Sequence, residues 1–148
     1  MIKIFRGKIP DGGQERISLR TRQGKIGYRI VKFQLLGVDS NSSYENVTKI
    51  YNQEQSSVDS TIDFTDPTVL AAGIYQQNSV GQTYPLDSII IFDNKIVNQD
   101  VYVTCKNAEG NEDINFYIEL EVIPLTDMAA EYTTLKDLRT YTQMNPWR

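Results

Sequence analysis

The sequence predicts an all-β, mainly antiparallel fold: a single β-sandwich or jelly-roll domain with one short internal helix and a C-terminal helix or extended arm. Short segments of alternating apolar and polar residues recur with turn residues between them, which is typical of sandwiches. Strands and helices do not alternate as in βαβ folds, and the sequence contains no repeat. The 148 residues suffice for one hydrophobic core, which we assign to residues 1–125, with residues 126–148 as the helix or arm.

The N-terminal part of the chain predicts three strands. The first begins at Ile2 and ends at a turn in residues 10–13, Pro-Asp-Gly-Gly. The second covers residues 16–22, where apolar residues and arginines alternate between two faces. Residues 25–38 predict a long third strand whose alternation changes phase near residues 29–32. Because such a slip exchanges the two faces, we expect a β-bulge there.

A short internal helix is predicted near the middle of the chain. Asp66 is a suitable N-cap, Pro67 fits the first turn, and Gly73 fits the C-terminal cap that follows Val-Leu-Ala-Ala. Before this helix we expect a polar loop, a strand, a second polar loop and a short extended segment, at residues 39–45, 47–51, 52–60 and 61–64.

The C-terminal half predicts a surface loop at residues 76–85, three further strands and a helix. Residues 88–92, Ser-Ile-Ile-Ile-Phe, are a continuous apolar run, typical of a strand buried on both faces. Residues 101–105 and 114–123 predict a hairpin, because glycine and asparagines lie between them. Residues 126–141 predict a helix with an imperfect apolar stripe. The second arm of the hairpin alternates, with Phe116, Ile118, Leu120 and Val122 facing the core and Tyr117, Glu119 and Glu121 facing away; the helix stripe is Met128, Leu135 and Leu138.

Charge is distributed unevenly along the chain. Residues 1–38 hold nine basic and two acidic residues, a net charge of +7, whereas residues 39–148 hold six basic and seventeen acidic residues, a net charge of −11. The overall net charge of −4 therefore conceals a dipolar sequence. Such a chain suits an acidic partner surface or head-to-tail self-association. The low pI of about 4.8 argues against nucleic acid as the partner.

The composition argues against catalysis and metal binding. The chain has no histidine and a single cysteine, Cys105, which excludes an intramolecular disulfide, zinc sites of the Cys/His type and histidine-based acid–base catalysis. We therefore expect no enzyme activity, no cofactor and no metal site. No apolar run reaches the length of a membrane span, and the N-terminus lacks the apolar stretch of a signal peptide, so we expect synthesis in a cytoplasm.

Two groups of residues are candidates for partner binding. The first is basic and lies on or near the second predicted strand: Arg16, Arg20, Arg22 and Arg29. The second, Tyr141, Met144 and Trp147, is apolar although chain ends are usually polar. We expect residues 140–148 to reach a neighbouring subunit with Trp147 as the anchor, or else to fold back onto their own domain.

Other conspicuous residues have simpler structural interpretations. Acidic loop residues could bind calcium, but they lack the spacing of calcium loops and are more readily explained as solvated side chains. Glu119 and Glu121 project from one face, where they would blunt a sheet edge rather than act as a catalytic pair. Cys105 suits a small core residue. The nine tyrosines suit an interface or stacking on sugars. The acidic residues in question are Asp59, Asp63, Asp66, Asp93 and Asp100.

Three parts of the sequence together carry a family resemblance. They are Phe-Arg-Gly-Lys-Ile-Pro-Asp at residues 5–11, the stretch IIIFDNKIVNQDVYVT at 89–104 followed by NFYIELE at 115–121, and TLKDLR at 134–139. The combination resembles a group of small proteins encoded by marine tailed bacteriophages, and it spans most of the chain. The resemblance implies a viral origin and a virion structural role, and it transfers no catalytic residues.

The sequence therefore predicts a virion structural protein, most concretely a capsid cement or decoration protein that stabilises the head through contacts between subunits. We expect it to be made in the host cytoplasm, to reside in the virion, and to bind the major capsid protein and other copies of itself, preferably as a trimer. Neither nucleic acid nor a membrane is expected as a partner. The alternative is a tail or adaptor component, or a module that binds carbohydrate on the host surface.

Overall fold

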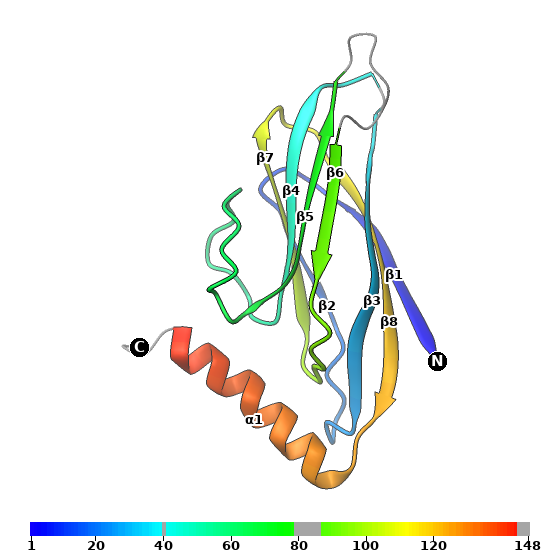
Figure 1. Cartoon of the computed structure of the whole chain (residues 1–148), viewed down its shortest axis with the longest axis vertical. Helices are drawn as coiled ribbons and strands as arrows, with labels where there is room; N and C mark the ends of the chain where they lie inside the picture. The colour runs from blue at the N-terminus through cyan, green and yellow to red at the C-terminus, as the bar shows by residue number, and fades with distance from the viewer. Residues whose placement is uncertain (40, 79–86, 145–148) are drawn as a thin grey trace.

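The computed structural model shows a sandwich of two antiparallel β-sheets with one helix across its lower end (Figure 1). It describes residues 1–39, 41–78 and 87–144, with the backbone alone for residue 87 and residues 138–144. The elements are β1 (Ile2–Ile9), β2 (Gln14–Ile17), β3 (Ile26–Gly37), β4 (Tyr44–Tyr51), β5 (Val69–Gln77), β6 (Asp87–Phe92), β7 (Val101–Glu109), β8 (Ile114–Pro124) and α1 (Asp127–Met144).

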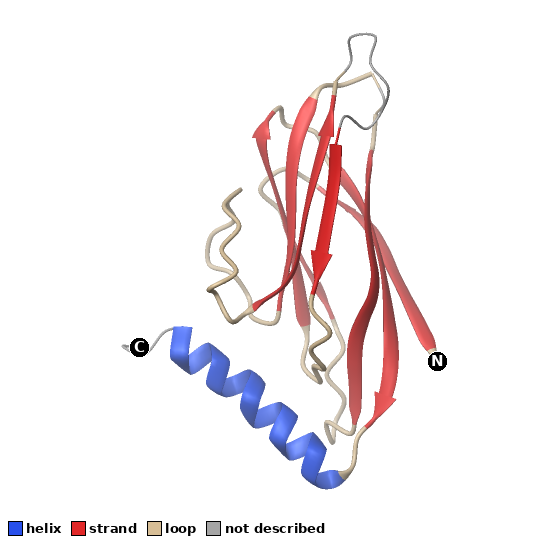
Figure 2. Ribbon diagram, in the orientation of Figure 1, coloured by secondary structure: helices blue, strands red, loops and turns tan. Residues whose placement is uncertain are grey.

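The two sheets differ in size. The smaller has three strands in the order β1-β8-β3, and the larger has five in the order β2-β7-β4-β5-β6 (Figure 2). All strand pairs are antiparallel. The predicted all-β sandwich and the predicted C-terminal helix are therefore confirmed.

The core lies between the sheets and is filled by alternate residues of each strand. On β8, Phe116, Ile118 and Leu120 are buried and Val122 packs partly buried against them. Tyr117, which alternates with them, is only half-buried. The alternation of apolar and polar residues thus placed the two faces of β8 correctly.

The β-bulge in β3 is also confirmed. The pairing of β3 with β8 shifts between Ile30, which faces Leu120, and Lys32, which faces Glu119. One extra residue, Val31, is inserted and is partly exposed. The shift keeps apolar residues buried on both sides of the bulge, which explains why the sequence changes phase there.

The predicted internal helix is wrong, because residues 69–77 form strand β5. The local turn chemistry is present: Asp66 Oδ1 accepts a hydrogen bond from the Thr68 backbone N–H at 2.8 Å. This turn leads into a strand, since β5 is paired on both sides with β4 and β6. A Cβ added at Gly73 would lie 2.8 Å from Ile90 Cδ1 and from Leu35 Cδ1. Sheet packing therefore requires small residues here. In the sequence, the same small residues followed by a glycine look like the end of a helix.

Two predictions about neighbouring strands are also wrong. β7 and β8 follow each other in sequence but belong to different sheets, so residues 101–123 cross the sandwich and do not form a hairpin. β6 is an edge strand of the larger sheet, where Ile89 and Ile91 are 48% and 51% exposed, so its apolar run is not buried on both faces. β8 is the central strand of its sheet, and its glutamates therefore do not blunt an edge.

Several predicted boundaries shift. β2 ends at Ile17, so Arg20 and Arg22 lie after the strand, and β4 begins at Tyr44 inside the predicted loop. Residues 61–64 lie in a loop, not in a strand. This loop covers the outer face of β4, where Lys49 is 2% exposed although its side chain points away from the core.

Helix α1 begins after Thr126, whose Oγ1 accepts a hydrogen bond from the Ala129 N–H at 3.2 Å. Its buried side consists of Ala130, Thr133 and Asp137, and Asn98 Nδ2 donates to the hydroxyl of Thr134 at 2.7 Å. The predicted stripe is wrong in the described part: Met128 and Leu135 are 83% and 65% exposed, and the side chain of Leu138 lies outside the described residues. Tyr132, also 65% exposed, lies on the same side of the helix. Polar contacts and small residues dock the helix and leave an apolar side in solvent.

Candidate interaction surface

The outer face of the three-stranded sheet combines side chains that are far apart in sequence. Because β8 pairs with β1 on one side and with β3 on the other, residues directly opposite one another form rows across the sheet. We call these four rows the β1-β8-β3 face. They are Lys8–Asn115–Leu36, Arg6–Tyr117–Gln34, Ile4–Glu119–Lys32 and Ile2–Glu121–Arg29.

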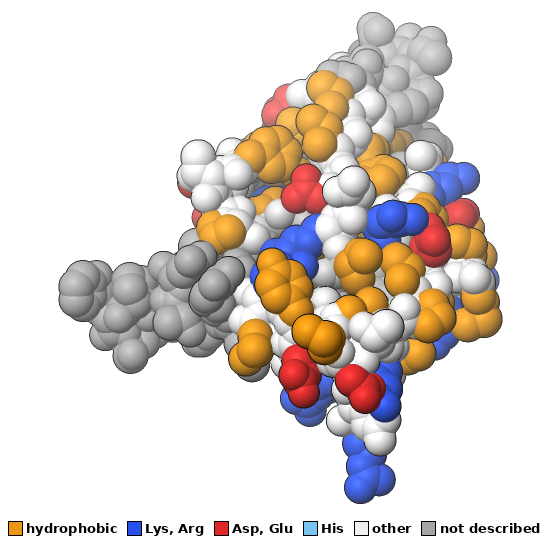
Figure 3. Space-filling view, turned by 60° about the horizontal axis from the view of Figure 1, so that its bottom comes forward, with side chains coloured by type: hydrophobic (Ala, Val, Ile, Leu, Met, Phe, Trp, Pro, Cys, Tyr) orange, Lys and Arg blue, Asp and Glu red, His pale blue; other side chains and the backbone are white. Residues whose placement is uncertain are grey.

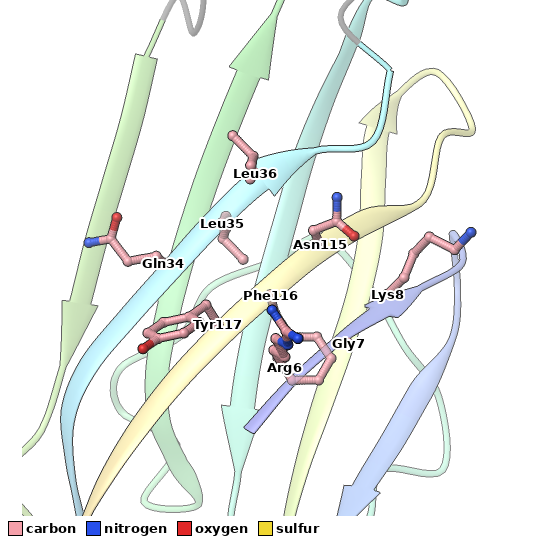
Figure 4. A pocket seen from close by; sticks show the side chains of 9 residues that line it. All are labelled: Arg6, Gly7, Lys8, Gln34, Leu35, Leu36, Asn115, Phe116 and Tyr117. Atoms are coloured by element: carbon pink, nitrogen blue, oxygen red, sulfur yellow. The ribbon is translucent and has the colours of Figure 1, made fainter. Parts of the chain in front are cut away.

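An open groove of about 700 Å³ lies over the first two rows (Figure 4). Arg6 and Lys8 provide cations from β1, Gln34 provides an amide from β3, and Asn115 and Tyr117 provide an amide and a phenol from β8. Such a mixture of donors, acceptors and an aromatic ring suits binding to a polar surface. The groove is lined by Arg6, Gly7, Lys8, Gln34, Leu35, Leu36, Asn115, Phe116 and Tyr117.

Tyr117 is held at the centre of this face by its neighbours. Its hydroxyl donates a hydrogen bond to Glu119 Oε2 at 2.8 Å, and Lys32 Nζ lies 5.7 Å from its ring centroid. The hydrogen bond to Glu119 raises the pKa of the Tyr117 phenol, with a smaller contribution from desolvation, while Arg6 acts to lower it. The phenol therefore stays protonated and its ring is fixed in orientation.

Exposed aliphatic side chains lie among the charged ones on the edge strands of the β1-β8-β3 face. Ile2, Ile4 and Leu36 are 46%, 56% and 66% exposed, and Val31 and Val38 are also exposed. Arg29 and Glu121 neutralise each other at 2.7 Å, whereas no carboxylate among the described residues lies within 4 Å of Arg6. Arginine and tyrosine are enriched at protein interfaces, and the exposed aliphatic groups beside them add apolar area to the surface.

The four predicted basic residues do not form one site. Asp100 contacts two of them in different ways. Its carboxylate lies 3.8 Å from the Arg16 side-chain Nε and accepts a hydrogen bond from the Arg20 backbone N–H at 3.0 Å. Arg20 and Arg22 line a separate polar groove of about 600 Å³ with Gln99 and other residues. Arg29 belongs to the β1-β8-β3 face, in the other sheet. Side chains of Tyr141 and Met144, and all of Trp147, lie outside the described residues.

The folded protein interleaves the charges that the sequence separates. Basic strands of the N-terminal part lie beside acidic ones of the C-terminal part, as β1 does beside β8. Figure 3 shows basic and acidic side chains interspersed with hydrophobic ones on the lower end of the molecule. Charges that lie far apart in the sequence are therefore brought side by side in the fold, while the dipole of the whole molecule stays a prediction. Ion pairs in the described part of the chain that join the two parts include Lys8–Asp113 at 3.8 Å, Arg16–Asp100 at 3.8 Å, Lys25–Asp127 at 2.9 Å and Arg29–Glu121 at 2.7 Å.

The acidic loop residues have structural partners. Asp59 binds Lys49 at 2.8 Å, and Asp63 and Asp66 accept hydrogen bonds from Thr65 and Thr68. Within residues 1–39, 41–78 and 87–144 no three potential metal ligands cluster. Cys105 is buried in β7, where burial raises the pKa of its thiol and a hydrogen bond from Asn46 acts in the opposite direction.

Comparison of the chain with models of known protein families and with curated protein sequences found no match. In the described part of the structure, no helix is long and apolar enough to cross a membrane.

Proposed function

We propose that this protein is a structural subunit of a virus particle, most concretely a cement or decoration protein of the head. Its β1-β8-β3 face carries this proposal. A sheet face whose rows combine aliphatic groups, cations and an aromatic ring offers a broad contact area on a preformed backbone. The major capsid protein is the proposed partner of this face.

A second exposed apolar surface supports a role in tying subunits together. Met128, Tyr132 and Leu135 occupy one side of α1, at the lower end of the sandwich. A protein that stabilises a shell by contacts must touch more than one neighbour, and modest contacts are multiplied by symmetry. Two separate contact surfaces on one rigid domain suit that task.

The test of location is the protein's copy number in purified particles of the virus that encodes it, measured by quantitative mass spectrometry. A head cement protein is expected in hundreds of copies, because it follows the symmetry of the capsid. About six or twelve copies would instead identify a tail or adaptor component. Absence from the particle would refute the structural role.

The test of the binding face is co-sedimentation with particles that lack the protein. Arg6→Glu reverses an exposed charge that has no nearby carboxylate, and it should weaken binding more at low than at high salt, because salt screens exposed charges. Arg20→Glu is the matched control, since Arg20 lies away from this face. Equal loss of binding for both variants would show that this face is not the docking surface.

Carbohydrate binding is the second candidate function, favoured by the groove around Tyr117. An aromatic ring beside the amides of Gln34 and Asn115 is an arrangement that can stack on a sugar and bind its hydroxyls. A glycan array with the wild-type protein and Tyr117→Ala tests it. Glycan binding that Tyr117→Ala abolishes would favour a host-binding module over a cement protein.

A further inference from the structure

β6 has a free edge that differs from the other strand edges of the sandwich. A strand edge presents unpaired backbone N–H and C=O groups, and soluble proteins commonly protect it with charged side chains. β1 carries Lys3, Arg6 and Lys8, while β3 carries Arg29 and Lys32, and β2 is short and carries Glu15 and Arg16. In contrast, residues 88–92 of β6 contain no charged residue and no proline.

The pairing of β6 with β5 determines which of its backbone groups are free. The Asp93 N–H donates to the Leu70 carbonyl at 2.9 Å, and the same antiparallel register pairs Ile91 with Ala72 and Ile89 with Ile74. Hydrogen-bonded and non-hydrogen-bonded pairs alternate along such a ladder. The N–H and C=O groups of Ser88, Ile90 and Phe92 therefore point away from β5, toward the free edge.

Side chains on β6 have the pattern of a covered strand. Ile89 and Ile91 are 48% and 51% exposed on the outer face of the larger sheet, and Phe92 is 38% exposed. Ile90 faces the core and is partly buried there. Unpaired backbone groups bordered by exposed isoleucines are suited to pairing with an apolar extended strand.

We infer that β6 pairs with β6 of a second copy of this chain, in antiparallel orientation, and joins the two larger sheets into one continuous sheet. A two-fold axis beside Ile90 pairs Ile90 with Ile90 and Ser88 with Phe92 through the free backbone groups identified above. It also places Ile89 of each copy opposite Ile91 of the other, so the exposed isoleucines cover one another. Residues 88–92 are uncharged, so no like charges meet among them, whereas residue 87, an aspartate, lies opposite Asp93 of the other copy at each end of the pairing.

This contact is separate from the β1-β8-β3 face and does not depend on the proposed function. The two-fold pairing gives an even-numbered assembly, in place of the trimer favoured by the sequence. A copy of the same chain is the favoured occupant because the free backbone groups of residues 88, 90 and 92 and the exposed side chains of Ile89 and Ile91 are arranged symmetrically about Ile90.

Light scattering combined with size exclusion tests the pairing on the full chain. The wild-type protein should be a dimer. Ile89→Lys with Ile91→Lys places lysine opposite lysine in the dimer, and should raise its dissociation constant about tenfold or more. The matched variant, Ile89→Lys with Ile91→Glu, has the same polarity but places lysine opposite glutamate, and should remain dimeric. Far-UV circular dichroism checks that both variants are folded.

Three outcomes would overturn the inference. A monomeric wild-type protein at high concentration would show that the edge does not pair with itself. A Lys/Lys variant that still dimerises would place the dimer contact on another surface. Dissociation of both variants to the same extent would exclude the register centred on Ile90. The proposed function is tested separately: if the folded, monomeric variant with Ile89→Lys and Ile91→Lys still binds particles, the proposed function does not require the dimer.

Discussion

Lys49 Nζ lies 2.8 Å from Asp59 Oδ1 and 2.6 Å from the Thr61 carbonyl oxygen, and this contact fixes the loop of residues 52–68 over β4. Burial alone lowers the pKa of Lys49, but hydrogen bonds to Asp59 and Tyr51 outweigh it and leave the pKa raised. The hydrogen bond from Lys49 lowers the pKa of Asp59. The pair therefore stabilises the fold at neutral pH, and this contribution is lost as pH rises through the raised pKa of Lys49 or falls through the lowered pKa of Asp59.

The two partners of this ion pair should respond unequally to mutation. Asp59→Asn leaves the Lys49 ammonium buried without its counter-ion and should lower the free energy of unfolding by about 1–2 kcal/mol, less than for a fully buried pair because Asp59 is largely exposed. Lys49→Met should cost less, since Asp59 can be solvated. Urea titrations measure both, with Asp63→Asn as a control in the same loop; it should cost less than Asp59→Asn, because an amide oxygen can still accept the hydrogen bonds from Thr65 and no buried cation loses its partner. A larger loss for Lys49→Met would mean that the packing of its stem matters more than its charge.

The faces of β8 predict opposite costs for neighbouring positions. Phe116→Ala removes a buried ring next to Gly7 and should lower the free energy of unfolding by about 3–5 kcal/mol by leaving a cavity. Glu119→Ala removes a side chain on the solvent face and should cost less than about 0.5 kcal/mol. Denaturant titrations compare them, and the reverse order would mean that the core is packed differently from the structure.

A buried polar network at Asn46 should matter for stability and for thiol reactivity. Its amide donates to Asn107 Oδ1 at 2.7 Å and to Cys105 Sγ at 2.9 Å. Asn46→Ala leaves Asn107 and Thr48 with unsatisfied groups and should cost about 2 kcal/mol or more. Cys105 should be unreactive toward a thiol reagent in the native protein and become labelled faster in Asn46→Ala. Rapid labelling of the wild-type protein would contradict the buried position of this thiol.

Asp137 predicts a pH dependence of helix docking. It is fully buried on α1, neither carboxylate oxygen accepts a hydrogen bond of good geometry, and burial raises its pKa against the opposing influence of Lys95, Lys136 and the Asn98 N–H. The folded state therefore favours the protonated acid. The contribution of Asp137 to the stability of the folded state is therefore greatest below its ordinary pKa of about 3.8, and it is lost as pH rises through the raised pKa of the folded state.

Asp137→Asn should remove this penalty. The variant should be more stable than the wild type at pH 7, by about 1–3 kcal/mol, and the difference should shrink toward pH 4 and below. Thermal unfolding followed by circular dichroism at several pH values measures the stability of both proteins. The other carboxylates titrate in both, so their contribution cancels in the difference. A variant that is less stable than the wild type at pH 7 would show that the carboxylate is stabilised where it lies.

Alternation within a strand was enough to predict its faces, as Phe116 and Tyr117 show, and a change of phase was enough to locate the bulge at Val31. Local patterns failed where a distant strand decides the outcome. Gly73 is small because Leu35 and Ile90 pack against it, and this was mistaken for the end of a helix. An apolar run such as that of β6 occurs in central strands and in edge strands, so the sequence alone does not distinguish the two positions.

The candidate surface was accessible to prediction only in part. The outward direction of Tyr117 follows from alternation, and this could have marked the residue as exposed. Its neighbours Arg6 and Gln34 come from strands paired at long range, and their register is fixed by packing and not by local sequence. Of the arginines that stand out in the sequence, Arg16 and Arg29 are instead paired with carboxylates, those of Asp100 and Glu121.

The central place of β8 in its sheet sets the order in which the protein can mature on the ribosome. β1 and β3 are synthesised early, yet each finds its ladder partner in β8, the last strand of the described chain. Closing a loop of this length is a slow step in folding. A nascent or prematurely terminated chain without β8 therefore lacks the row formed by Arg6, Tyr117 and Gln34. Only a chain that includes β8 presents this surface.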